Sequence, residues 1–372
     1  MSITCHSTQT KLKTAMVYAG GTISSLMTSG GYREGGHVID FASKLQERFP
    51  DFTSQYEVIA TKVAYTGLSE NIDLDYLCDI ANAVREVLKT NPQSIILTHG
   101  TDSMEQTAEF LQNELEELLK EKGTKITLTG ADKDLSCSDT DAWANLGFAF
   151  ESTRSKTDPG VYVAFHGKFI PAHLVVKEPF NGIEMNYTSK SDRGYLDAVW
   201  EQDRKSNELI SKLHSTLDSS PDELSKVIEY QVNIFRPSHK EFVDYVKQNK
   251  TKAVLLVLYH SGTANTEKPD LSIASLVKKL REELGVVFFA VTENGEPIDL
   301  HSYETSVKLR EAGVVPLYDM KKAVALAKLN LVTCDSTSES IDRMLANVAG
   351  EIDESRIIKT DIEELKRLYG QR

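Results

Sequence analysis

Short β-rich apolar runs alternate with segments of helical periodicity along the first half of the chain. The apolar runs occupy residues 14–20, 56–65, 94–98, 125–130 and 160–165, and helical periodicity occupies, among others, 73–90 and 139–153. This alternation predicts a parallel sheet covered by helices. Residues 166–177 then look like a β-hairpin, because Gly167 interrupts two apolar strands.

The pattern changes over residues 187–232, which are charged and mostly helical in periodicity. We interpret this segment as an inter-domain connection with inserted helices. Apolar runs and helical periodicity then alternate again to the end of the chain. The sequence therefore predicts an α/β fold with a larger N-terminal parallel-sheet domain and flanking helices (1–186), a helical connection or insertion (187–235) and a smaller C-terminal α/β domain (236–372).

Composition narrows the function classes. The chain has 372 residues, 40% of them hydrophobic, and a formal net charge of −13. An acidic surface repels phosphate backbones, so nucleic acid is not expected as a main partner. No apolar run approaches membrane-spanning length, and the N-terminus lacks the apolar core of a secretory signal. Four widely spaced cysteines without metal-ligand spacing fit free thiols, so we expect a cytoplasmic protein without a metal site.

The most informative stretch is "LTHGTDSMEQTAEF", residues 97–110, where a buried strand becomes a helix. One reading is structural: Gly100 supplies the bend, and Thr101 or Asp102 caps the helix. The functional reading is that ligands bind beside the carboxyl ends of strands in open α/β sheets. A hydroxyl next to a carboxylate at such a place could handle an amino acid.

Three further sites follow predicted strands, and each also has a structural reading. Residues 17–36 carry Thr22 after two glycines and then Tyr32 in a glycine-rich segment, which is either a flexible surface loop or a mobile lid. Ser69 could simply cap the helix that follows it. Lys177, a single cation in an apolar strand, could snorkel to water or protect a sheet edge.

Taken together, these side chains suit nucleophilic catalysis. A threonine hydroxyl is a poor nucleophile until a neighbouring base accepts its proton, and Tyr or Lys can act as that base when its environment lowers its pKa.

Three segments resemble the N-terminal signatures of the bacterial-type L-asparaginase family: "YAGGTIS", "LTHGTDSMEQTAEFL" and "LTGADKDLSCSDTDAWANL". "GVYVAFHGKFIPAHLVVK" is similar to the family segment that ends in its catalytic lysine. "YHSGTANT" and "AGVVPLYDMKKAVALAKL" resemble the family's C-terminal domain. The resemblance covers nearly the whole chain except 187–232.

The resemblance implies roles for five catalytic residues. Thr22 corresponds to the candidate nucleophile, and Tyr32 to the lid tyrosine that activates it. Thr101, Asp102 and Lys177 correspond to a second proton-relay triad. Which threonine attacks first stays open, with Thr22 ranked above Thr101. The expected reaction is hydrolysis of L-asparagine to L-aspartate and ammonia, with some activity on L-glutamine and without a cofactor.

The resemblance also implies substrate contacts. Ser69 would hold the α-carboxylate, Glu70 follows it, and Asp102 would also hold the α-ammonium. The main chain around Gly130 and Ala131 would face the side-chain amide. Asn265 would reach into a neighbouring subunit's site, which implies a homodimer or homotetramer with shared active sites.

The chain departs from the family pattern at several places. Asp132 and Lys133 follow Gly130-Ala131 where the family has Met or Gln and then Arg; Asn71 replaces an aspartate, and Ser103 a threonine. Two other functions remain open. One is a glutaminase-like subunit of a tRNA-dependent amidotransferase, against which we weigh the acidic charge and the roughly twenty residues before Thr22. The other is a non-catalytic amino-acid sensor, which would need neither the lysine nor the tyrosine.

Overall fold

The computed structural model describes residues 11–29, 33–35, 39–49, 51–177, 187–190, 192–216, 227–235, 238–293, 295–333 and 336–370. These residues divide into two compact units. The first consists of the described residues of Met1–Leu26, Gly35–Ser69 and Asp75–Val175, and the second of those of Met27–Glu34, Glu70–Leu74 and Val176–Arg372.

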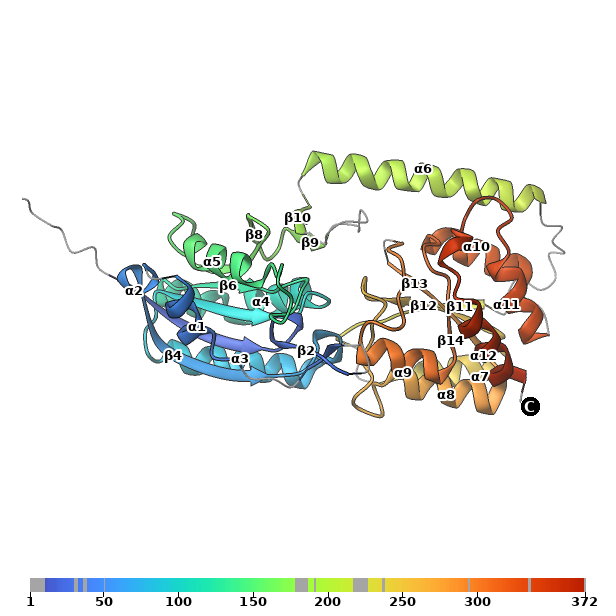
Figure 1. Cartoon of the computed structure of the whole chain (residues 1–372), viewed down its shortest axis with the longest axis horizontal. Helices are drawn as coiled ribbons and strands as arrows, with labels where there is room; N and C mark the ends of the chain where they lie inside the picture. Colours follow the sequence, from blue (N-terminus) through green and yellow to red (C-terminus); the bar gives the residue numbers. More distant parts are fainter. Residues whose placement is uncertain are drawn as a thin grey trace, which may run out of the picture. The chain divides into compact units, whose positions relative to one another are not determined.

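A six-stranded sheet forms the centre of the first unit (Figure 1). Its strand order is β4-β1-β5-β6-β7-β8, with bounds β1 Leu12–Ala19, β4 Tyr56–Tyr65, β5 Ser94–His99, β6 Lys125–Thr129, β7 Gly160–Phe165 and β8 Lys168–Pro171. Strands β4, β1, β5, β6 and β7 run parallel to one another, and β8 pairs antiparallel with β7. All six residues of β5 are buried, as expected for a central strand covered on both faces. The predicted parallel sheet and hairpin are therefore confirmed.

Helices cover both faces of this sheet, with α3 (Leu74–Leu88) and α5 (Ala142–Ser152) drawn on opposite sides in Figure 1. Met16, Tyr18 and Ile96 pack against apolar side chains of α5 and of α1 (Phe41–Arg48). The other elements before β6 are η1 Thr22–Ser24, β2 Leu26–Met27, β3 Arg33–Glu34, α2 Phe52–Gln55, η2 Ser69–Asn71 and α4 Met104–Lys122. Of these, β3 and parts of β2 and η2 belong to the second unit. Helix α4 is followed by Gly123, whose φ of 64° is left-handed and therefore suits glycine.

The second unit contains a four-stranded parallel sheet in the order β11-β12-β13-β14. The strands are β11 Val227–Gln231, β12 Ala253–Leu258, β13 Val287–Thr292 and β14 Val314–Pro316. The helices are α6 Arg193–Thr216, α7 Lys240–Gln248, α8 Ile273–Leu284, α9 Glu304–Ala312, α10 Lys322–Val332, α11 Thr337–Leu345 and α12 Lys359–Gly370, with a short η4 at Glu354–Arg356. Side chains of β12 and β13 form one apolar core with α10, α11 and α12.

The segment predicted as inserted helices holds one long helix and a strand. Helix α6 has 24 residues, and its buried Leu213 packs into the core of the second unit. Strand β11 is an edge of that unit's sheet. The remaining pair, β9 (Val175–Lys177) and β10 (Tyr187–Ser189), forms a small sheet of its own. Within the described residues, no helix has the length and apolar character needed to cross a membrane.

Candidate active site

The turns that carry the two threonines are in backbone contact. Strands β1 and β5 are neighbours, with Ala19 opposite His99, so the turns after them lie at the same sheet edge. A Cβ added to Gly21 would lie 2.2 Å from both the Cα and the N atom of Gly100, and Gly21 has a φ of 84°. Only glycine fits such an approach and such a backbone. The turn before Thr22 therefore packs directly on the turn before Thr101.

Ser69 lies against the same turn. A Cβ on Gly100 would come within 2.4 Å of the Ser69 Oγ. The Asp102 amide donates to the Ser69 Oγ (3.3 Å), and the Ser103 hydroxyl donates to the Ser69 carbonyl oxygen (2.7 Å). The first unit thus brings together Thr22, Ser69, Thr101 and Asp102, each with 9% or less of its surface exposed.

The capping explanations for these residues do not fit the helix boundaries. The residue before α4 is Ser103, whose own side chain makes no capping hydrogen bond. Thr101 and Asp102 lie outside the helix. Ser69 belongs to η2, and α3 begins only at Leu74. Thr101, Asp102 and Ser69 therefore do not occupy the N-cap positions of the helices that follow them.

His99, the last residue of β5, was not among the sequence-predicted site residues. Its Nδ1 lies 2.7 Å from the Gly100 carbonyl oxygen. Burial lowers the pKa of His99 to about 4, so the imidazole is neutral near pH 7 and Nδ1 donates this hydrogen bond. The sequence signal for it was the polar end of an otherwise apolar strand.

The end of β6 adjoins the Thr101 turn. A Cβ on Gly130 would lie 2.5 Å from the His99 carbonyl oxygen and 3.3 Å from the Thr101 Cγ2. Ala131, the next residue, is fully buried. The main chain at Gly130 and Ala131, which we expect to face the substrate's side-chain amide, therefore begins next to Thr101.

The remaining predicted residues belong to the second compact unit or lie outside the described residues. Lys177, Glu70 and Asn265 belong to the second compact unit, and Tyr32 lies outside the described residues. Lys177 ends β9 and is buried. The Glu70 Oε1 accepts a hydrogen bond of 2.6 Å from the Thr305 hydroxyl.

Asn265 is bonded to its own chain. Its Nδ2 donates to the Asn71 carbonyl oxygen (3.0 Å), and its Oδ1 accepts from the Glu267 amide (3.2 Å). The Asn71 side chain in turn donates to the Glu267 carboxylate at 3.1 Å. An aspartate at position 71 could not donate this bond, so the departure at Asn71 fits its surroundings.

One group of side chains within the described residues has the composition of a metal site. Ligand atoms of Asp132, Asp141 and His166 lie within 4.8 Å of one another, and all three residues are partly buried. No metal site was predicted here.

The fold and this cluster define an α/β protein with a candidate ligand site at the carboxyl edge of its larger sheet. A family model described as the N-terminal part of asparaginase matches residues 13–200, which is half of the 372-residue chain. The chain therefore belongs to the asparaginase family.

Curated relatives carry another name within this family. The chain is 26% identical over 362 residues to a glutamyl-tRNA(Gln) amidotransferase subunit from Methanococcus maripaludis, covering 93% of this chain and 82% of the relative. A protein of the same name from Pyrococcus abyssi is 26% identical over 355 residues, and the match covers 91% of this chain and 76% of the relative.

Two solved structures are also similar. One is the thermostable L-asparaginase from Thermococcus kodakarensis (23% identity, TM-score 0.37, covering 92% of this chain and 99% of that one). The other is a probable cytoplasmic L-asparaginase from Campylobacter jejuni (18% identity, TM-score 0.43, covering 91% and 100%).

Proposed function

We propose that this protein hydrolyses the side-chain amide of a small amino acid, releasing ammonia, with Thr22 as nucleophile. The observation that carries the proposal is the packing of Gly21 on Gly100, which joins the Thr22 turn to the Thr101 turn. Membership of the asparaginase family supports amide hydrolysis as the class of reaction.

Amide hydrolysis needs a nucleophile, a proton for the leaving ammonia and stabilisation of the tetrahedral oxyanion. Thr22 attacks the amide carbon and passes its proton towards Tyr32. Backbone N–H groups at the Thr22 and Thr101 turns hold the oxyanion. The proton from Thr22 then passes to the amide nitrogen, which leaves as ammonia. Water activated by the group of Thr101, Asp102 and Lys177 cleaves the acyl-enzyme, giving the acid and returning a proton to the Thr22 hydroxyl.

The charged ends of the substrate would be held by the residues around Ser69. Ser69 takes the α-carboxylate, and Asp102 takes the α-ammonium, with Glu70 beside them. The main chain at Ala131 faces the side-chain amide, and Asn265 completes the site. This chemistry requires no cofactor, and we propose a cytoplasmic homo-oligomer.

Two uses of the released ammonia compete. An L-asparaginase acts alone on L-asparagine, with L-glutamine as a second substrate. An amidotransferase subunit would instead supply ammonia to a reaction on tRNA, and the curated relatives favour this second use more directly than the first. The net charge of −13 does not oppose it, because another subunit can hold the tRNA.

Ammonia release by the purified chain, assayed on each amide with and without a chelator, tests the proposal. An L-asparaginase should release ammonia from L-asparagine with no partner added, and chelation should leave the rate unchanged. Activity that appears only with a partner complex would select the amidotransferase subunit. Binding of L-asparagine or L-glutamine without ammonia release, both with and without the chelator, would favour the amino-acid sensor.

A further inference from the structure

The loop after β6 is held by residues at the start of α5. The Thr140 hydroxyl donates to the Lys133 carbonyl oxygen at 2.8 Å. The Asp141 carboxylate accepts from the Asp132 amide (3.0 and 3.1 Å to its two oxygens) and from the Lys133 amide (2.9 Å). The main chain of the loop is thus fixed by side chains that follow it in sequence.

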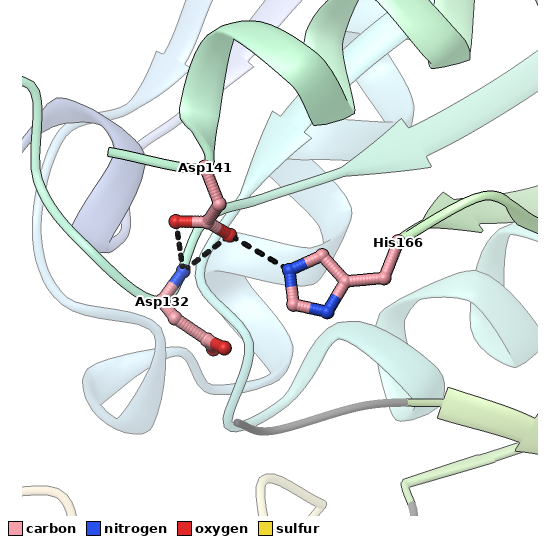
Figure 2. Close-up of side chains that lie close together, drawn as sticks. All are labelled: Asp132, Asp141 and His166. Carbon is pink, nitrogen blue, oxygen red and sulfur yellow. Dashed lines mark hydrogen bonds and ion pairs between the residues drawn. The ribbon is translucent and has the colours of Figure 1, made fainter. Parts of the chain in front are cut away.

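Asn145 and His166 complete this network. The Asn145 Nδ2 donates to the Gly130 carbonyl oxygen (3.2 Å) and to the Asp141 Oδ2 (2.8 Å), and its Oδ1 accepts from the His166 amide (3.0 Å). The His166 Nε2 donates to the Asp141 Oδ2 at 3.2 Å. Figure 2 shows Asp141 between the Asp132 main chain and the His166 ring.

The β7–β8 hairpin presents His166 to Asp141. His166 and Gly167 form a two-residue turn, with φ values of 43° and 76°, between the paired residues Phe165 and Lys168. Two positive φ angles are typical of the tight turns that suit a hairpin. The turn conformation therefore fixes the position of the His166 Cα, from which the imidazole extends.

Ala131 is the residue that this network surrounds. Among the described residues, no hydrogen bond involves the main chain of Ala131, although Gly130 before it and Asp132 after it are both tied down. Ala131 is fully buried, and buried backbone groups normally have partners. Its main chain is therefore available to a ligand beside the Thr101 turn.

We infer that Asp141 and His166 are positioning residues that hold the Ala131 main chain against the substrate's side-chain amide. This inference rests on the function proposed above. Burial of the Asp141 carboxyl opposes its ionisation, but hydrogen bonds from His166 and from the Asp132 and Lys133 amides outweigh burial and hold its pKa below the usual value. The carboxylate is therefore charged near pH 7 and binds these donors strongly.

A metal ion fits this group less well. A carboxylate offers about four acceptor positions, and Asp141 already accepts from the Asp132 amide, the Lys133 amide, Asn145 and His166. A cation would have to displace the bonds that shape the loop.

Asp141→Asn tests the inference, with Asp139→Asn as its matched control. Asp139 undergoes the same chemical change in the same loop, but it is exposed and pairs only with the Lys133 Nζ (2.5 Å) among the contacts described. In Asp141→Asn, an NH2 group replaces an oxygen that accepts N–H bonds, so the loop must shift. A small displacement of a contact to the reacting group costs about tenfold or more in kcat/KM, and Asp139→Asn should cost nothing.

The deciding measurement is the ratio of kcat/KM for L-asparagine to that for L-aspartic acid β-hydroxamate. These substrates share their α-groups and differ at the side-chain amide. A smaller folded fraction lowers both values by the same factor and leaves the ratio unchanged. A displaced Ala131 main chain should change the ratio by about threefold or more.

His166→Asn provides a second variant if Asp141→Asn does not fold. Asparagine tolerates the left-handed backbone, so only the imidazole is lost, and the ratio should change in the same direction by a smaller factor. Wild type inactive on both substrates would refute the proposed function itself. An active wild type with an unchanged ratio in the folded variants would overturn the positioning role. Wild-type activity could instead be lost on chelation and restored by Zn2+ or Mn2+, with no such response in Asp141→Asn. That result would overturn the positioning role and show that Asp141 binds a metal ion.

Discussion

At the residue scale, His99 makes the candidate site sensitive to acid. Its imidazole is fully buried at the end of a central strand, and burial lowers its pKa to about 4. In the unfolded chain a histidine has a pKa of about 6.5. The unfolded state therefore binds a proton more readily, and folding is favoured most above pH 6.5 and less as the pH falls towards 4.

We predict that protonation of His99 lowers the unfolding free energy by about 2 kcal/mol when the pH falls from 7.5 to 5. Urea unfolding at the two pH values, followed by circular dichroism, gives this difference for wild type and for His99→Asn. The variant keeps a donor near the Nδ1 position but does not titrate in this range. Its loss over the same pH interval should be smaller than that of wild type by this amount. Equal losses in the two proteins would show that His99 does not control the acid response.

The sequence pattern locates part of the candidate site but not the Asp141–His166 contact, for a physical reason. Thr22, Ser69, Thr101 and Asp102 lie two to four residues after strands of one sheet, so their position after these strands indicates one sheet edge. The Asp141–His166 contact joins residues 25 positions apart through a hairpin turn. Periodicity carries no information about such a contact.

At the element scale, the central strands were easier to predict than the edge strand of the second unit. Strands β5, β12 and β13 are buried along their whole length, and each has an apolar run at its centre. Strand β11 is half-buried and lies at a sheet edge, and its sequence was grouped with the inserted helices.

A buried ion pair joins elements of the second unit. Lys328 of α10 and Glu351 have fully buried side chains, with Nζ and Oε1 2.5 Å apart. The same Nζ donates to the carbonyl oxygens of Met344, at the end of α11, and of Ala346. Burial lowers the pKa of Lys328, while Glu351 opposes that effect.

We predict that Lys328→Met destabilises the protein by about 3–5 kcal/mol, because it leaves the Glu351 carboxylate buried without its cation. The double variant Lys328→Met/Glu351→Gln should recover part of that loss. Lys308→Met is the control, since Lys308 pairs with Glu304 on the surface of α9, and an exposed pair contributes less than about 1 kcal/mol. Urea unfolding of all three variants measures these effects. A Lys328→Met loss no larger than the control's would contradict the assigned role.

At the scale of the whole molecule, the candidate residues are divided between two compact units. Thr22, Ser69, Thr101 and Asp102 lie in the first, and Lys177, Glu70 and Asn265 in the second. The family resemblance suggests that Asn265 serves the site of a neighbouring subunit. Its hydrogen bonds to Asn71 and Glu267 offer the alternative that it acts within its own chain.

We predict that mixing inactive Thr22→Ala and Asn265→Ala proteins restores activity if sites are shared. In an isologous dimer the two subunits exchange identical contributions, so a hybrid has one site with both defects and one with neither. With random exchange, half of the dimers are hybrids, and activity should reach about a quarter of the wild-type value. Ammonia release after subunit exchange, with hybrids confirmed by differential tags, measures this. Hybrids without recovered activity would place Asn265 in the site of its own chain.

The Lys328–Glu351 pair also sets an order of events during synthesis. The two residues are 23 positions apart, so the ammonium group leaves the ribosome well before the carboxylate that neutralises it. Until then, α10 cannot bury Lys328 without an uncompensated charge. A nascent chain stalled between these residues should therefore keep this part of the C-terminal unit open to proteases, and the final docking of α10 waits for Glu351 to emerge.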